Sequence, residues 1–424
     1  MRISILGLGY VGLTGAACLI DQGYDVIGVD INEYKISELN NGKCPINEPG
    51  VEELLQKGLA EGRFRATTNT FEAVSSSNLS FVCVGTPSGA SGAHDMSFIV
   101  NVSKQIVEAI KVVAKEEPLF KQEVVYRSTM SPGSIHNLIA PIFETIGNGT
   151  QGKNWEIFYN PEFLRESTAI KDYYNPPKIV IGHRQGADTA TIDSIYENIK
   201  CEKFHVGIRE SEITKFLDNS FHALKVAYGN EIGRLCKTLD VNTDEVMEIF
   251  LADTKLNISS LYLTPGGAFG GSCLPKDVRA LNWLANSNGV KSEIISNIIN
   301  SNESHKEFIA NYVEGFIPAG SKVLVVGLSF KSNTDDLRES PQIDVIQKLI
   351  GRGYPLRVYD PDIEFSNIHG KNLAFTYANI PHLESYLIDD AELKTESFDK
   401  VIITKNIPIP VEFDEKDLIR IDKL

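Results

Sequence analysis

The sequence predicts an α/β fold in which two Rossmann-like, doubly wound domains are joined by a long central helix. Strand-like apolar runs alternate with helical patterns over about the first 200 residues, which is typical of a parallel sheet. From about 210 to 250, apolar residues recur at spacings of three and four without a proline, and this indicates one long helix. After about residue 320 the alternation begins again. We therefore expect three domains, at residues 1–205, 206–300 and 301–424.

The N-terminal domain begins with the pattern of a dinucleotide-binding site. A short apolar run leads into Gly7, Gly9 and Gly12, and a helix-competent stretch follows. Glycines in this place let backbone N–H groups at a helix start approach a pyrophosphate. The next apolar run ends in Asp30, at a distance typical of the carboxylate that binds ribose hydroxyls. We expect NAD as the cofactor, because Asp30 would repel a 2′-phosphate, although Lys35 leaves NADP open.

The rest of the N-terminal domain continues this alternation. Strand-like runs at 24–30, 79–85 and 123–129 are separated by helical patterns, one of them at 99–110. The segment 159–168 begins with Asn-Pro and is rich in charge, so we interpret it as a turn or loop. Its charged side chains either bind a ligand or lie at the surface.

Polar residues on the long helix share one face. Lys215, Asn219 and His222 are spaced i, i+4 and i+7, and Asn230 lies near the same line. A groove lined by these residue types suits a polyhydroxylated anionic ligand, and a solvated helix face is the alternative. Eight large apolar residues fall mostly on the opposite side: Ile213, Phe216, Leu217, Phe221, Leu224, Tyr228, Ile232 and Leu235. A single supporting domain rarely covers such a stripe, so we expect a homodimer or a multiple of one, with an intramolecular spine as the alternative.

A glycine-rich segment leads to a single thiol at Cys273. The small residues around it leave room for a substrate atom, while Lys276 can supply positive charge and Asp277 a base. A thiolate forms at neutral pH only beside a cation or a helix N-terminus, so this setting favours a catalytic thiol. Four other cysteines are interpreted as inert small hydrophobes: Cys18, Cys83, Cys201 and Cys236. The six cysteines form neither CxxC pairs nor a disulfide framework, so we expect a reducing cytoplasm, and we predict no metal site.

The C-terminal domain repeats the α/β pattern without the glycine signature. Gly327 follows a strand-like run but is not part of a GxGxxG motif, so we expect this domain to hold a different ligand from the first. Lys331 and Arg338 fall in the mouth of the second sheet, outside the carboxyl ends of its strands. These two residues either bind a ligand or are ordinary surface charges.

The charge of the chain excludes several kinds of partner. Its 41 Lys and Arg against 56 Asp and Glu give a formal net charge of −15, which repels nucleic acid and anionic membranes. No apolar run approaches the ~20 residues that a membrane helix needs. We expect neither a nucleic acid nor a membrane as partner, whereas a few cations in one cleft still allow an anionic small molecule.

Six segments occur here in an order that resembles the nucleotide-sugar 6-dehydrogenases, the family of UDP-glucose and GDP-mannose dehydrogenases. They are GLGYVG, CVGTP, YRSTMSPG, NPEFLREST, the Lys215–Asn219 pair and GGSCLPKD. The resemblance spans essentially the whole chain. Three further segments are most similar to GDP-mannose 6-dehydrogenases: NGKCPINEPGVEELL, NPEFLRESTAIKDYYNPP and SFKSNTDDLRESP. The resemblance implies an NAD-binding domain, a central dimerisation domain, a sugar-nucleotide-binding domain, and oxidation of a sugar C6 alcohol to a carboxylate with two NAD⁺.

The resemblance also implies a role for individual residues. The nucleophile matches Cys273, which would hold the substrate first as a thiohemiacetal and then as a thioester. Lys215 and Asn219 would stabilise the oxyanion. Residues that position water or polarise the reacting group match Thr129, Glu162 and Asp277. Cofactor positions match Gly7, Gly9, Tyr10, Val11, Gly12, Asp30, Lys35, Thr86, Thr129, Lys276 and Arg338. Substrate positions match Glu166, Lys215, Asn219, His222, Asn230, Tyr262, Gly267 and Lys331.

Three positions depart from the GDP-mannose pattern. Leu261 replaces an aromatic residue, Thr264 an arginine and Gly267 a phenylalanine. These positions flank the substrate, so the sugar nucleotide stays open between GDP-mannose, UDP-glucose and UDP-N-acetylhexosamines. A two-electron β-hydroxyacid dehydrogenase is a second hypothesis, although it leaves Cys273 unexplained. A non-catalytic regulator that binds NAD or a nucleotide sugar is a third.

Overall fold

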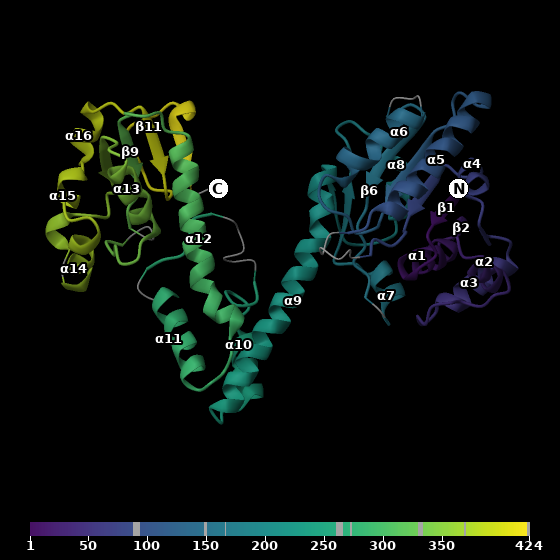
Figure 1. Cartoon of the computed structure of the whole chain (residues 1–424), viewed down its shortest axis with the longest axis horizontal. Coiled ribbons are helices and arrows are strands. Elements are labelled where there is room, and N and C mark those ends of the chain that lie inside the picture. Colours follow the sequence, from purple (N-terminus) through teal and green to yellow (C-terminus); the bar gives the residue numbers. More distant parts are fainter. Residues whose placement is uncertain are drawn as a thin grey trace. The chain divides into compact units, whose positions relative to one another are not determined.

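The computed structural model describes the chain except residues 88–93, 148–150, 166, 260–265, 272–273, 330–333, 369 and 422–424. The described residues form two compact units, Met1–His222 and Ala223–Leu424. Figure 1 labels their elements. Each unit contains its own α/β sheet, which confirms the predicted fold class. The three domain boundaries stay predictions, and residue 300 lies inside helix α12 (Glu293–Gly315).

The first unit is built on an eight-stranded sheet in the order β3-β2-β1-β4-β5-β6-β7-β8. Its strands are β1 (Arg2–Leu6), β2 (Asp25–Val29), β3 (Phe64–Thr67), β4 (Leu79–Val82), β5 (Gln122–Tyr126), β6 (Trp155–Tyr159), β7 (Lys178–Gly182) and β8 (Glu202–Val206). All neighbours are parallel except β6 and β7, which differ from the wholly parallel sheet that we expected. These two strands pair at Tyr159 and Gly182.

Helices cover both faces of this sheet, as the doubly wound prediction requires. They are α1 (Tyr10–Asp21), α2 (Glu33–Asn40), α3 (Val51–Ala60), α4 (Thr70–Ser75), α5 (Ser97–Glu116), the π-helix η1 (Ile135–Ile139), α6 (Ala140–Gly147), α7 (Ala169–Tyr174) and α8 (Ala190–Ile195). Alternate side chains of each strand enter different cores. Ile3 and Ile5 of β1 pack with α1 and α3, whereas Leu6 packs with α4, α5 and α6.

The long central helix is shorter than the sequence predicts. Helix α9 runs over Ile208–Thr238, and α10 begins afresh at Thr243 and ends at Ala252. Asp240 between them has φ 55°, a left-handed conformation that no helix interior adopts. Asn242 then caps α10, since its side-chain oxygen accepts hydrogen bonds from the backbone N–H groups of Asp244 and Glu245. The expected single helix from 210 to 250 is therefore wrong in its C-terminal part.

The second unit has a four-stranded parallel sheet in the order β10-β9-β11-β12. The elements in chain order are α11 (Leu274–Ser287), α12, β9 (Val323–Val326), α13 (Pro341–Gly351), β10 (Leu356–Tyr359), the 3₁₀ helix η2 (Phe365–Asn367), α14 (Gly370–Asn379), α15 (Leu383–Tyr386), α16 (Asp390–Thr395), β11 (Lys400–Ile403), the 3₁₀ helix η3 (Glu415–Asp417) and β12 (Leu418–Arg420). Val323 and Val325 face one core with α12 and α13, and Leu324 and Val326 face the other. The second α/β repeat is thus confirmed.

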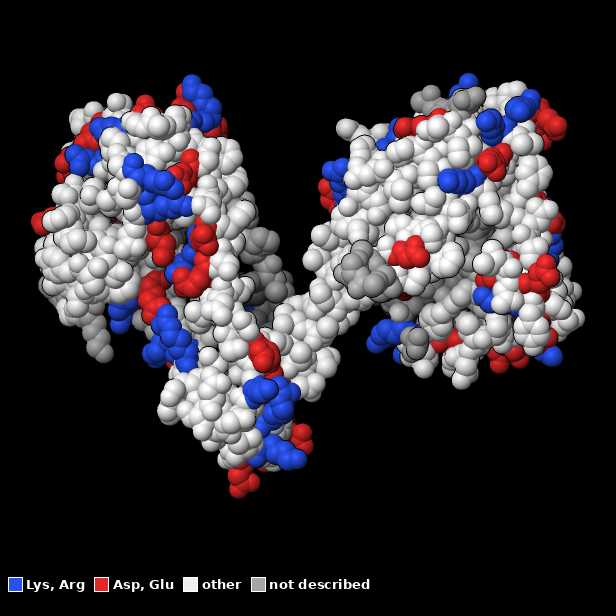
Figure 2. All heavy atoms as spheres, viewed as in Figure 1, with Lys and Arg blue, Asp and Glu red and all other residues white. Residues whose placement is uncertain are grey.

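None of the described helices combines the length and the hydropathy that crossing a bilayer requires. Figure 2 shows acidic and basic side chains interspersed over the visible face of each unit. The excess of acidic residues is therefore spread over that face instead of being gathered in one patch.

Candidate active site

The glycines after β1 meet three different requirements. Gly7 has φ +97°, and a Cβ there would lie 2.7 Å from the backbone nitrogen of Val84. A Cβ on Gly12 would lie 1.9 Å from the carbonyl oxygen of Gly7, so this glycine lets α1 pack against the loop. A Cβ on Gly9, the N-cap of α1, would meet nothing within 4 Å. The open space at Gly9 lies where a pyrophosphate would meet the N-terminus of α1.

Asp30 stands at the carboxyl end of β2, beside this loop. Its carboxylate accepts hydrogen bonds from the backbone N–H groups of Leu8 and Asn32, both at 3.0 Å. Lys35 Nζ donates to it at 2.7 Å. Burial raises the pKa of Asp30, but the hydrogen bonds from Lys35, Asn32 and Leu8 outweigh burial and lower it below the usual value. Lys35 and the two N–H groups therefore hold Asp30 in its ionised form.

Tyr10 and Val11 open helix α1, and Tyr10 takes part in a contact that the sequence did not reveal. Its hydroxyl donates to the buried carboxylate of Glu48 at 2.6 Å. The same carboxylate accepts the backbone N–H groups of Ser167 and Ala169 at 2.7 and 2.8 Å. Glu48 therefore ties the start of α1 to the start of α7. Its place in an Asn-Glu-Pro-Gly turn is a local signal, but the backbone N–H groups that it accepts are more than 100 residues away along the chain.

The loops after β4 and β5 are joined directly. The hydroxyl of Thr86 donates to the carbonyl oxygen of Thr129 at 2.8 Å, which brings two predicted cofactor residues together. The turn after Thr129 is held by the buried carboxylate of Glu212, which accepts the N–H groups of Gly133 and Ile135. Glu212 was not predicted, because its carboxylate acts on backbone far from α9 in sequence.

A charged pair lies at the carboxyl end of β6. Glu162 Oε1 and Lys215 Nζ are 3.0 Å apart, and their side chains are only 12% and 13% exposed. Glu162 Oε2 accepts the N–H of Leu164 at 2.7 Å, which fixes the carboxylate. The pair brings together a candidate base and a candidate oxyanion-stabilising cation. Asn219 and His222 follow Lys215 on α9 as exposed residues, and Asn230 lies farther along the same helix.

Arg127 is a second cation near this pair that the sequence analysis missed. It follows β5 and, with Asn160 and Glu162, lines a cavity of about 30 Å³, enough for one water molecule. Its Nε is buried without a hydrogen-bond partner among the described residues. Burial lowers the pKa of Arg127, but the groups around it, Glu162 among them, outweigh burial and raise it above the usual value.

In the second unit, the glycine-rich segment before Cys273 is held by α12. Asn302 accepts the N–H of Phe269 at 2.9 Å and donates to its carbonyl oxygen at 2.8 Å. His305 Nε2 lies 2.7 Å from the carbonyl oxygen of Gly266. A Cβ on Gly270 would lie 2.2 Å from the carbonyl oxygen of Glu339, so only glycine allows this approach to the start of α13.

The other predicted residues of the second unit are spread over its loops. Lys276 and Asp277 lie exposed in the first turn of α11, with Nζ and Oδ1 3.4 Å apart. Arg338 donates to Asp336 at 2.7 and 2.8 Å. Gly267 is exposed. Outside the described residues are Cys273, Glu166, Tyr262, Lys331, Leu261 and Thr264.

Four of the described cysteines are not poised as nucleophiles. Burial raises the pKa of the Cys18 and Cys83 thiols to about 12. Burial also raises the pKa of Cys44 and Cys201. These thiols stay protonated at neutral pH, which agrees with the inert role predicted for three of them.

Family models match the chain in three consecutive parts. Residues 1–200 match the NAD binding domain of the UDP-glucose/GDP-mannose dehydrogenase family, 209–304 its central domain and 324–421 its UDP binding domain. The chain belongs to this family. It is an NAD-dependent dehydrogenase, and the predicted family, enzyme class and cofactor are confirmed.

Individual relatives of this dehydrogenase extend over nearly its full length. It is 42% identical to GDP-mannose 6-dehydrogenase of Pseudomonas savastanoi pv. phaseolicola, covering 98% of this chain and 92% of the relative. It is 34% identical to UDP-glucose 6-dehydrogenase of Haloferax volcanii, covering 85% and 83%. Among solved structures, a ternary complex of GDP-mannose dehydrogenase from Pseudomonas aeruginosa matches with TM-score 0.92 and 40% identity over 99% and 96% of the two chains.

Proposed function

We propose that this dehydrogenase oxidises the C6 hydroxyl of GDP-mannose to a carboxylate and consumes two NAD⁺ per sugar. The observation that carries the choice of sugar is the similarity gradient. Proteins named GDP-mannose 6-dehydrogenase are 41–42% identical to this chain, whereas proteins named UDP-glucose 6-dehydrogenase are 34% identical. UDP-glucose and UDP-N-acetylhexosamines are the alternatives, because Leu261, Thr264 and Gly267 depart from the GDP-mannose pattern.

The glycine loop and Asp30 fit the cofactor. Gly9 leaves space for a pyrophosphate, and the Asp30 carboxylate lies at the strand end where a ribose would bind. NAD⁺, when bound, accepts one hydride per oxidation. Thr86, Thr129, Tyr10 and Val11 border the same strand ends and would orient it.

Proton removal, covalent attachment of the sugar and hydrolysis would be carried out by side chains of the protein. A base takes the C6 hydroxyl proton, directly or through water, as the aldehyde forms. The Cys273 thiolate adds to the aldehyde and gives a thiohemiacetal, whose oxyanion Lys215 and Asn219 would balance. A second oxidation turns this adduct into a thioester. Water, oriented by Thr129 and Asp277 or activated by Glu162, then releases the carboxylate and regenerates the thiolate.

The stoichiometry of NADH formation tests this proposal. The purified full chain is incubated with NAD⁺ and, in turn, GDP-mannose, UDP-glucose and UDP-N-acetylhexosamines. Two NADH per GDP-mannose are expected. Two NADH with a UDP sugar would reassign the substrate, one NADH would favour the hydroxyacid class, and none with any sugar would favour the regulator.

A cysteine substitution tests the covalent step. Cys273→Ser should lower steady-state turnover by several orders of magnitude while NAD⁺ still binds, because the thiohemiacetal and the thioester both need a thiolate at that position. Cys201→Ser is the matched control and should keep normal turnover, since that thiol is half-buried and protonated. Near-normal uronic acid formation by Cys273→Ser would contradict the mechanism.

We also propose a cytoplasmic homodimer, or a multiple of one, in which α9 meets a second copy of the chain. Its N-terminal half exposes Ile213, Leu217, Phe221 and Leu224 by 40%, 56%, 40% and 46%. Burying each side chain would stabilise the dimer by roughly 1.5–3 kcal/mol. Leu224→Asp or Tyr228→Asp should weaken association and activity together in sedimentation and turnover assays. A fully active monomer at micromolar concentration would contradict the dimer.

A further inference from the structure

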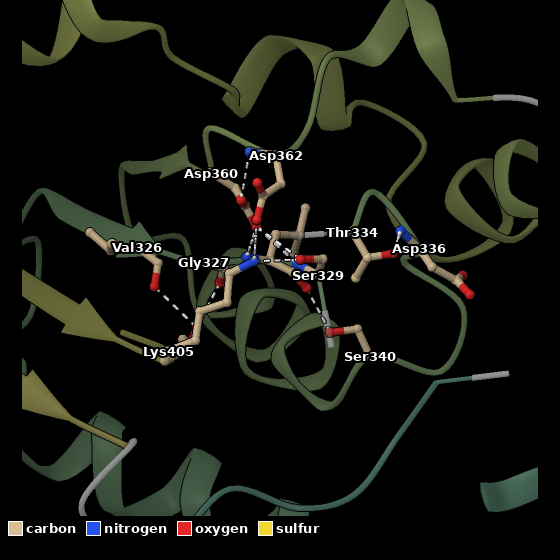
Figure 3. A network of polar contacts seen from close by, with 11 residues as sticks. Val326, Gly327, Ser329, Thr334, Asp336, Ser340, Asp360, Asp362 and Lys405 are labelled. Carbon is tan, nitrogen blue, oxygen red and sulfur yellow. Dashed lines mark hydrogen bonds and ion pairs between the residues drawn. The ribbon is translucent and has the colours of Figure 1, made fainter. Parts of the chain in front are cut away.

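The second unit contains a buried acid at the end of β10 that the proposed mechanism does not use. Figure 3 shows the Asp360 carboxylate at the centre of a polar network. Its Oδ2 accepts the backbone N–H groups of Leu328 and Ser329 at 2.7 and 3.0 Å. Its Oδ1 accepts the N–H of Asp362 at 3.1 Å. The side chain of Asp360 is fully buried, so its charge needs a partner inside the protein.

Lys405, which follows β11, supplies that partner. Its Nζ lies 2.9 Å from Asp360 Oδ2 and 3.6 Å from Asp362 Oδ2, and it donates to the hydroxyl of Ser329. Only 9% of the side chain is exposed. The stem of Lys405 lies across Gly327, where a Cβ would come within 2.6 Å of Lys405 Cγ. Lys405 therefore joins the ends of β9, β10 and β11 from within the protein.

The network fixes the start of a segment that carries two predicted ligand-binding residues. The carbonyl oxygen of Leu328 also accepts the hydroxyl of Ser340 at 2.6 Å, which ties residue 328 to the start of α13. Farther along, Asn372 accepts the N–H of Leu337 at 2.9 Å. Lys331 and Arg338 both belong to this segment.

The ion pair also changes the charge of this edge of the sheet. Ligands of open α/β sheets bind outside the carboxyl ends of the strands, which is where Asp360 stands. An unpaired carboxylate there would repel a diphosphate, and Lys405 reduces that repulsion. A buried ion pair is costly to desolvate and adds little stability over an apolar pair, so its presence is better explained by conformation and charge at the site.

We propose that Lys405 and Asp360 are positioning residues for the nucleoside diphosphate of the substrate. They hold the backbone of residues 327–329 at the mouth of the sheet, and they offset the charge of the buried carboxylate at the strand ends. This proposal rests on the proposed function, since it assigns a support to the same sugar-nucleotide site.

The test is Lys405→Met with Lys400→Met as the matched control. Lys400 begins the same strand, β11, and pairs with Asp417 at 2.9 Å at the opposite end of that strand. For Lys405→Met we expect KM for the nucleotide sugar to rise about tenfold or more while kcat stays within about threefold. The Kd of NAD⁺ should not change in either variant. Lys400→Met should keep the wild-type KM.

A second variant guards against misfolding of the first. Asp360→Asn/Lys405→Met removes both charges, so no buried charge is left alone. It should still bind the nucleotide sugar more weakly than wild type, because an amide offers one acceptor oxygen to the N–H groups that the carboxylate held. A lower melting temperature with unchanged KM in the folded variants would mean a purely structural role and would overturn the proposal.

Equilibrium binding separates this proposal from the proposed function. Calorimetric Kd values for GDP-mannose, UDP-glucose and GDP are measured without turnover, and the tightest of the three is compared across the variants. Equal Kd values in wild type and both Lys405 variants would overturn positioning alone. A wild-type chain that binds none of the three would overturn both proposals.

Discussion

The two units use the same backbone arrangement at the edge of their sheets and close it in different ways. Gly7 donates its N–H to Val29 at 2.8 Å, and Gly327 donates to Tyr359 at 2.9 Å. The following leucine then donates to a strand-end acid in each unit, Leu8 to Asp30 and Leu328 to Asp360. Strand β11 stands beside β9 as β4 stands beside β1.

The difference comes from the residues that follow β4 in the first unit and β11 in the second. In the first unit the atoms nearest to a Cβ on Gly7 belong to the backbone of Cys83 and Val84. In the second unit the side chain of Lys405 lies across Gly327 and reaches the acid. The two acids are therefore paired from different elements: Asp30 with Lys35 of α2, and Asp360 with Lys405, which follows β11.

The largest expected effect is a difference in the stability lost when Asp360 or Asp30 is replaced. Asp360→Ala should lower the stability of the second unit by about 3–5 kcal/mol, because it leaves the buried Lys405 cation unpaired. Asp30→Ala should cost at most about 1 kcal/mol in the first unit, since the Lys35 side chain is 26% exposed and can turn to water. Amide hydrogen exchange, read separately for each unit, measures both values. Equal losses would show that the two edges are energetically alike.

A second effect concerns cofactor choice. The wild type should prefer NAD⁺ over NADP⁺ by at least ~10-fold in kcat/KM, because a 2′-phosphate would meet the Asp30 carboxylate. Asp30→Ala should reduce this preference about tenfold, whereas Asp360→Asn should leave the ratio unchanged. Steady-state kinetics with both cofactors checks the ratio. An unchanged preference in Asp30→Ala would mean that Lys35 outweighs Asp30.

A third effect tests whether the free space at Gly9 holds the cofactor. Gly9→Ala meets no atom within 4 Å, so the free energy of unfolding should change by less than about 1 kcal/mol. NAD⁺ affinity should nevertheless fall, because the new methyl group occupies the place of the pyrophosphate. Titration followed by NADH fluorescence gives the affinity. Normal binding would place the cofactor elsewhere.

The smallest effect is a pH dependence. Hydrogen bonds hold the pKa of Asp30 below its usual value of 3.8 despite its burial. The lowered pKa stabilises the folded chain above the unfolded-state pKa, and this contribution is lost as pH falls through the folded-state pKa. The stability difference between wild type and Asp30→Asn should therefore shrink below about pH 4. A difference that grows on acidification in urea unfolding would contradict the sign of this shift.

Local patterns in the sequence were enough to predict the glycine loop, Asp30, the helix under Lys215 and the second α/β repeat. Each depends on residues close together in the chain, whose spacing sets the geometry. Glu48 and Lys405 could not be predicted, because they bind backbone or side chains 121 and 76 residues away. The end of α9 was missed because Asp240 adopts a left-handed conformation that nothing in its neighbours requires.

Because α9 is continuous from Ile208 to Thr238, it should tolerate insertions and deletions poorly. One residue inserted between His222 and Asn230 would rotate Asn230 by about 100° and shift it by about 1.5 Å relative to Lys215. A surface loop absorbs such an insertion by bulging, but a helix transmits it to every later residue. Point substitutions in this stretch can therefore accumulate in the family one at a time, while insertions and deletions should be confined to the connections on either side of α9.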